Sequence, residues 1–115
     1  MLNAQRQFWQ SAVLGVAIGI AACQAASAQD TTLQITVQNH QFSPSELRAP
    51  ANKPIVIVIK NNDATPMEFE SVSLRVEKII AAKSQGSIRL RALSPGRYEF
   101  FDDFNQSTRG SLTVQ

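Results

Sequence analysis

Residues 55–59 read Ile55-Val56-Ile57-Val58-Ile59, a run of five β-branched residues. Such side chains are restricted at χ1 and suit the pleated surface of a strand better than a helix. The run is also too short for an ordinary helix, and it is bounded by Pro54 and by the turn-forming residues 61–66. It therefore predicts a core strand that is covered on both faces.

Strands are also predicted before this run. From Thr31 onward, Leu33, Ile35 and Val37 alternate with polar residues, which is typical of a half-buried strand. The alternation slips at Asn39-His40, which indicates a turn or a bulge. Two prolines then bracket residues 45–49, so this segment is expected to be an edge or a very short strand.

The second half of the chain continues in the same way. Residues 72–80 fit strand alternation poorly, and both a short helix and an irregular crossover remain open for them. Residues 102–109 are expected to be a polar loop. The other segments predict short strands, around Phe69, at Ile88 and Leu90, at Arg97 to Phe101 with Tyr98 and Phe100 inward, and at Gly110 to Gln115. About seven short strands predict an all-β fold, an antiparallel Greek-key β-sandwich.

The first 28 residues are predicted to be a signal peptide. Arg6 supplies a positive charge, residues 11–22 are apolar or small, and Ala26-Ser27-Ala28 has the small-x-small form of a cleavage site. Residues 29–115 are then one periplasmic domain. Residues 20–23 also resemble a lipobox, so a lipoprotein anchored at Cys23 is an alternative.

The composition excludes several classes of function. The chain has 115 residues, a formal net charge of +2, one cysteine and one histidine. An internal disulfide is therefore excluded. The cations are dispersed, which argues against a nucleic-acid partner. No nucleophile–base pair, Gly-rich phosphate loop or CxxC motif is present, so we do not expect an enzyme.

Three segments in order resemble the cupredoxin family and together cover nearly all of residues 29–115. They are residues 42–47 leading to Pro54-Ile55-Val56, residues 61–63 with Pro66, and residues 95–100, which read Pro-Gly-Arg-Tyr-Glu-Phe. The resemblance implies the cupredoxin sandwich.

The same resemblance shows where the family's copper ligands would lie. The cysteine position corresponds to Asp102 and the first histidine position to Met67. The remaining positions correspond to Asp103 or Asn105, and to Thr108. A type I blue-copper centre needs a thiolate and two imidazoles. We therefore expect no type I copper in this chain.

The chain is more similar to a branch of cupredoxin-like proteins found with bacterial iron- and copper-uptake permeases. That branch carries a Phe-Glu-Ser segment, here residues 69–71, and an acidic Asp-Phe loop, here residues 101–104. The resemblance implies an iron or copper ion as ligand, and a membrane metal permease or another periplasmic protein as partner. A histidine usually follows the acidic-Phe pair in that branch, whereas Asn105 stands here.

Cupredoxin topology brings several loops together at one end of the sandwich. That end is expected to gather a set of metal-ligand candidates: His40, Met67, Glu68, Glu70, Asp102 and Asp103. Carboxylate and imidazole groups suit iron, Mn(II) and Cu(II), while a thioether suits Cu(I).

Each candidate also has a purely structural interpretation. His40 could be a solvated residue of a strand-end loop, and Met67 could fill a gap in the core. The two glutamates could be the solvent face of a strand, and Arg97 or Arg109 could pair with the aspartates. The leading hypothesis is a metal-binding accessory protein of iron or copper uptake. The alternatives are a metal-free module that docks on a permease and a divergent electron-transfer or ferroxidase component.

Overall fold

The computed structural model describes residues 30–115 together with Gly15 and Gly19. Apart from these two glycines, the predicted signal peptide lies outside the described residues, and so does the alternative anchor at Cys23. No helix long and apolar enough to cross a membrane occurs in the part of the chain that is described. That part forms nine strands: β1 (Thr31–Gln38), β2 (Gln41–Ser43), β3 (Glu46–Ala49), β4 (Ile55–Asn61), β5 (Met67–Ser71), β6 (Val76–Ile80), β7 (Gln85–Leu90), β8 (Gly96–Asp102) and β9 (Asn105–Val114).

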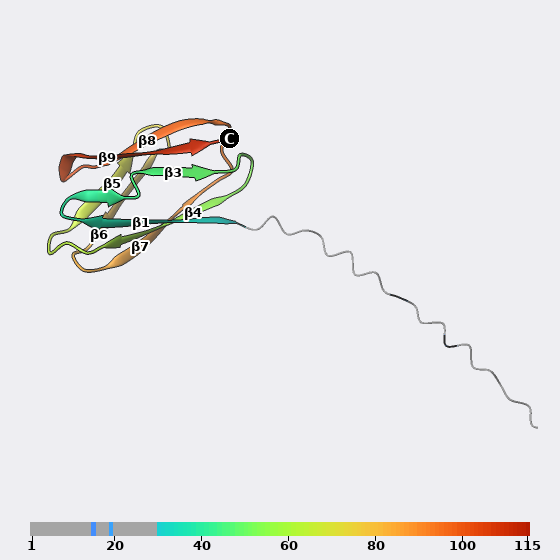
Figure 1. Cartoon of the computed structure of the whole chain (residues 1–115), viewed down its shortest axis with the longest axis horizontal. Coiled ribbons are helices and arrows are strands. Elements are labelled where there is room, and N and C mark those ends of the chain that lie inside the picture. Colours follow the sequence, from blue (N-terminus) through green and yellow to red (C-terminus); the bar gives the residue numbers. More distant parts are fainter. Residues whose placement is uncertain (1–14, 16–18, 20–29) are drawn as a thin grey trace, which may run out of the picture.

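The strands form two layers, which Figure 1 shows packed face to face. One sheet has the order β2-β1-β4-β7 and the other has the order β3-β9-β8-β5-β6. The predicted all-β sandwich is confirmed. The sheets are mixed, however, because β1 pairs with β4 and β3 with β9 in parallel. The chain changes sheet between β2 and β3 and again before β4, so these parallel partners are not joined by a hairpin.

The run at residues 55–59 forms β4, near the middle of the four-stranded sheet. Ile55, Ile57 and Ile59 are completely buried. Val56 and Val58 are only half-buried, whereas coverage on both faces was expected. The reason is that this sheet packs against the other sheet on one side only.

Three phenylalanines join the two sheets at the centre of the core. The rings of Phe69 on β5 and Phe100 on β8 are stacked with their centroids 4.8 Å apart. Phe42 on β2 meets the Phe100 ring edge-on at 5.2 Å. Aromatic pairs in these geometries contribute about 0.5–1.5 kcal/mol beyond the area that they bury.

Two connections differ from the sequence prediction, and a third confirms it. Residues 72–75 form a turn and residues 76–80 form β6, so the region left open is neither a helix nor an irregular crossover. The loop expected at residues 102–109 is instead a tight turn at Asp103 and Phe104, after which β9 begins. The turn predicted at Asn39-His40 is present, with φ values of 51° and 56°. Both values suit the two-residue hairpin turn that joins β1 to β2.

Candidate metal centre

The outer face of the five-stranded sheet carries two glutamates on β5. Along this strand the side chains of Met67 and Phe69 enter the core, so those of Glu68 and Glu70 lie on the opposite face. In the sheet Glu68 pairs with Ile79, and Glu70 lies between Glu77 on β6 and Phe101 on β8. The sequence pattern therefore indicated correctly that both carboxylates share a face.

Asp103 joins these glutamates from the turn between β8 and β9. Its backbone N–H donates to the carbonyl oxygen of Glu68 over 2.9 Å, which fixes the turn beside β5. One carboxylate oxygen from each of Glu68, Glu70 and Asp103 lies within 4.8 Å of the other two. We call these three residues the carboxylate cluster.

Glu77 adds a fourth carboxyl group beside the cluster. A hydrogen bond with Glu77 is the main cause that raises the pKa of Glu68, with burial second. Partial burial raises the pKa of Glu70, and the charge of Asp103 adds to this effect. Within residues 30–115 no lysine or arginine forms an ion pair with any of the four groups. Like charges gathered in this way disfavour one another's ionisation.

Asp102 has a different environment from its neighbour Asp103. It is 2% exposed, and its Oδ1 accepts hydrogen bonds from the backbone N–H groups of Glu68, at 2.9 Å, and Phe104, at 3.0 Å. Asp102 therefore closes the β8–β9 turn and ties it to β5. Its role in the structure is to position the cluster.

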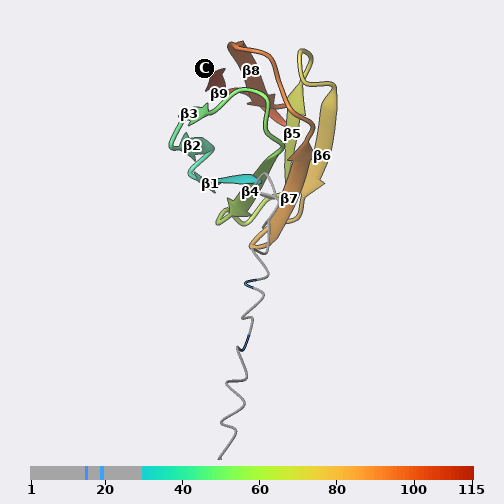
Figure 2. The same cartoon turned by 90° about the vertical axis from the view of Figure 1, so that its right-hand side faces the viewer.

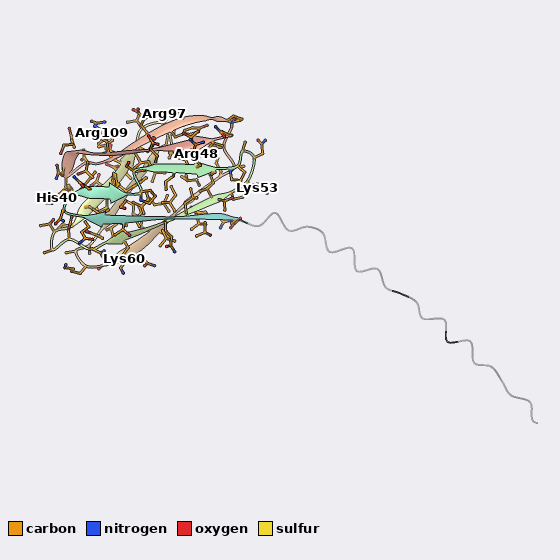
Figure 3. All side chains as sticks on the ribbon, in the orientation of Figure 1. His40, Arg48, Lys53, Lys60, Arg97 and Arg109 are labelled. Atoms are coloured by element: carbon orange, nitrogen blue, oxygen red, sulfur yellow. The ribbon has the colours of Figure 1, made fainter. Side chains whose placement is uncertain are left out.

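Met67 and His40 also lie apart from the cluster. Met67 is 2% exposed and belongs to the core, so its thioether is on the other side of β5 from the glutamates. His40 lies at the end of the sandwich in the β1–β2 turn, as Figure 3 shows. Its Nδ1 is 3.8 Å from Oδ2 of Asp63, and the imidazole is not among the groups that meet in the cluster.

Asp63 fixes the turn that carries His40. Its carboxylate accepts hydrogen bonds from the backbone N–H groups of Asn39, at 2.7 Å, and His40, at 2.9 Å. The bond from His40 is the main cause that lowers the pKa of Asp63. In addition, the Thr108 hydroxyl donates to the His40 carbonyl oxygen. His40 is thus held at the same end as the β8–β9 turn but in a separate environment.

The two arginines that were expected to compete for the aspartates have other partners. Arg97 Nε lies 3.9 Å from a carboxylate oxygen of Glu99, and both side chains are mostly exposed. The Arg109 guanidinium lies 5.2 Å from the centroid of the Phe101 ring. Neither arginine neutralises the carboxylate cluster.

The structure therefore brings together three of the six candidates, Glu68, Glu70 and Asp103. Glu77, the fourth carboxyl group, is not among the residues that the sequence analysis singled out. Its position follows from the register of the β5–β6 hairpin, which places it opposite Glu70. A turn predicted at residues 72–75 would have placed Glu77 opposite Glu70 from the sequence.

The donors of the cluster are all oxygens, which suit iron, Mn(II) or Cu(II) better than Cu(I). A type I copper centre does not fit this chain. Its only cysteine, Cys23, precedes the described domain, and His40 is its only histidine. At the positions of the cysteine and first histidine ligands, Asp102 binds backbone N–H groups and Met67 packs in the core.

Comparison with known proteins supports the same fold. Residues 10–114 match the family described as cupredoxin-like domain. An uncharacterized protein of Rickettsia prowazekii (strain Madrid E) is 41% identical over 82 residues, which cover 71% of this chain and 66% of that protein. The chain thus spans just under two thirds of that relative's length.

Solved structures with a similar fold include copper proteins. The metal-binding domain of the Streptococcus pneumoniae D39 Cu(I)-exporting P-type ATPase CopA has a TM-score of 0.64 at 16% identity, covering 76% of this chain and 97% of that one. An oxidized amicyanin mutant has a TM-score of 0.60 at 15% identity, with coverage of 72% and 81%. A chain of a heme-copper terminal oxidase dimer has a TM-score of 0.66 at 14% identity, with coverage of 77% and 66%. At these identities the likeness concerns the fold alone.

Proposed function

The chain belongs to the cupredoxin-like domain family, and from this premise we propose that it is a periplasmic metal-binding accessory protein for iron or copper uptake. Family membership confirms the resemblance to cupredoxins, while the similarity to the permease-associated branch stays a prediction. The metal, the uptake role and the location are the proposed part.

The carboxylate cluster is the observation that carries this proposal. Its three donor groups lie within 4.8 Å of one another, and Glu68 is 9% exposed without a cationic partner among residues 30–115. Glu70 and Glu77 are direct cross-strand neighbours, an arrangement that destabilises a sheet when both are charged. A bound cation would neutralise these charges and compensate for the burial of Glu68.

The donor set favours iron or Cu(II) as the cargo. Carboxylate oxygens are hard ligands, and the thioether of Met67, which would suit Cu(I), is buried on the other side of β5. Glu70 and Asp103 are only partly buried, so a cation can enter and leave. Such a site suits a protein that collects a cation and presents it to a membrane metal permease or to another periplasmic protein.

The periplasmic location rests on the sequence of residues 1–28. Cleavage after Ala28 would release a soluble domain, while lipid attachment at Cys23 would leave seven residues before Asp30. Both forms place the domain outside the cytoplasm. Mass spectrometry of the purified mature protein distinguishes them.

Isothermal titration with Cu(II) and with Fe(II) tests the metal site. We expect saturable binding of at least one of them, tighter than about 1 mM, and loss of this binding in the double variant Glu70→Gln/Asp103→Asn. The matched control is Glu46→Gln/Glu99→Gln, which removes two exposed carboxylates outside the cluster. Absence of saturable binding to the unmodified protein would contradict the proposal, as would an equal loss in the control.

A second candidate function, metal-free docking, is favoured by one observation. The large apolar residues that are more than half exposed within residues 30–115 are Val72, Ile79 and Phe104. Ile79 pairs with Glu68, and Phe104 follows Asp103, so two of them border the carboxylate cluster. If docking alone is the function, Ile79→Ser/Phe104→Ser reduces metal uptake in cells while Glu70→Gln/Asp103→Asn does not.

A further inference from the structure

A hollow lies at the seam between the two sheets, away from the carboxylate cluster. Here β6 and β7, the edge strands of their sheets, run side by side, as Figure 2 shows. Near the middle of the seam Lys78 Nζ donates to the Ser87 carbonyl oxygen over 2.8 Å and joins the two edges. Beyond this bridge the edges enclose a hollow of about 630 Å³. Its lining residues are Ser73, Leu74, Arg75, Val76, Arg89, Leu90, Arg91 and Leu93.

The hollow combines an apolar floor with a basic rim. Leu74, Val76 and Leu93 are partly buried and pack against the core. Three arginines also line the hollow, and Arg89 alone has an ion-pair partner, Asp30, at 2.6 Å.

No carboxylate of the chain neutralises the other two arginines, Arg75 and Arg91. Within residues 30–115 neither forms an ion pair. The 29 residues before Asp30 contain no aspartate or glutamate, so that segment cannot supply one. The hollow is therefore complementary to an acidic ligand that comes from outside the chain.

The β7 edge also presents unpaired backbone groups to the hollow. The bond from Asn61 N–H to the Ser84 carbonyl oxygen, at 2.8 Å, makes these residues a hydrogen-bonded pair of the β4–β7 ladder. Bonding alternates along an antiparallel ladder, so residues 85, 87 and 89 direct their N–H and C=O groups away from β4. The Lys78 bond to Ser87 agrees with this direction. Within residues 30–115 no backbone group bonds to the N–H or C=O of Arg89, which therefore offer a donor and an acceptor at the hollow.

We propose that this hollow binds an extended acidic segment of a partner protein, which adds to the free edge of β7. Its backbone pairs with that of Arg89, and alternate carboxylates face Arg75 and Arg91. The apolar side chains of the partner segment, which alternate with these carboxylates, pack on Leu74 and Leu93. Strand addition of this kind obtains affinity from the backbone and specificity from alternate side chains. The site is independent of the metal proposal.

A protein segment suits this surface better than a membrane does. Membrane-surface binding buries protruding apolar side chains in the lipid, whereas the leucines here are recessed and partly buried. The hollow is also bounded by the edge of β7, where a polypeptide backbone can pair with the N–H and C=O groups of Arg89.

Fluorescence anisotropy of the purified protein with a labelled nonapeptide of alternating valine and glutamate, which begins and ends with valine, tests the proposal. We expect saturable binding with a Kd below about 1 mM that weakens with added salt. Arg75→Gln/Arg91→Gln is expected to weaken it roughly ten-fold, because it removes two exposed charges that face the carboxylates of the peptide. The matched control Arg48→Gln removes an exposed arginine of β3 and is expected to leave the Kd unchanged. Circular dichroism confirms that the variants are folded.

A second peptide separates strand addition from charge attraction. Replacing the central valine by proline keeps every carboxylate but removes a backbone donor, so binding should again fall about ten-fold. Equal binding of the proline peptide would refute strand addition, and an unchanged Kd in the Arg75/Arg91 variant would refute the site. Binding to vesicles with anionic headgroups, without binding to the peptide, would identify a membrane surface and overturn the proposal.

Discussion

Replacing Asp102 by alanine is expected to destabilise the fold strongly. The carboxylate is 2% exposed, and its Oδ1 accepts hydrogen bonds from two backbone N–H groups, those of Glu68 and Phe104. A hydrogen bond to a charged group contributes about 1.5–3 kcal/mol. The bond from Phe104 is only partly buried, so we expect a total loss of about 3–5 kcal/mol. With an m value of about 1 kcal/mol/M, the urea midpoint should fall by about 3 M or more.

The assay is urea unfolding followed by far-UV circular dichroism, with the variants Asp102→Asn and Asp103→Ala alongside. Asp102→Asn keeps an oxygen acceptor and should lose less than half as much stability as Asp102→Ala. Asp103→Ala removes a partly exposed group and should change the free energy of unfolding by less than about 0.5 kcal/mol, while it weakens metal binding. Similar midpoints for Asp102→Ala and Asp103→Ala would refute the assignment of Asp102 to a structural role and Asp103 to the cluster.

Three further predictions concern other parts of the domain. The Asn61 Nδ2 lies within hydrogen-bond distance of three backbone carbonyl oxygens, which share its two N–H groups, and its Oδ1 accepts one backbone N–H. Asn61→Ala should therefore cost about 2–4 kcal/mol in the same urea assay. Gly110→Ala would place a Cβ against the Phe100 ring and 2.7 Å from a backbone carbonyl oxygen, so the melting temperature of the variant should fall by several degrees. An unchanged melting temperature would contradict this packing. The pKa of Glu68 is raised in the folded state, so the folded protein binds more protons than the unfolded chain, and its stability should fall as pH rises from the usual glutamate pKa through the raised one. Glu77→Gln should make this fall smaller when unfolding is measured without metal at a series of pH values. A rise in stability over the same range would refute the prediction.

The sequence predicted the sandwich because each layer leaves a local pattern. The isoleucines of residues 55–59 became the buried face of β4, and the break at Asn39-His40 became a hairpin turn. Parallel pairing of β1 with β4 has no such local signal. It depends on where the chain crosses between the sheets, which side-chain alternation does not record.

The candidate site was only partly predictable, for reasons that particular residues show. Glu68 and Glu70 were placed correctly on one face by the two-residue period of a strand. The same period, continued from the inward Phe100, assigns Asp102 to the core. A polar residue there is unexpected from hydrophobicity, because its burial depends on two backbone N–H groups that only the folded turn brings to it.

The position of β9 in its sheet bears on the order of assembly. Residues 105–114 form the last strand along the chain, yet they lie between β3 and β8, and Glu46 pairs with Ser111. Pairing between segments so distant in sequence slows folding, because the loop between them must close first. The complete five-stranded sheet cannot form on a nascent polypeptide until residues 105–114 have emerged, so β3 has no partner in that sheet before then.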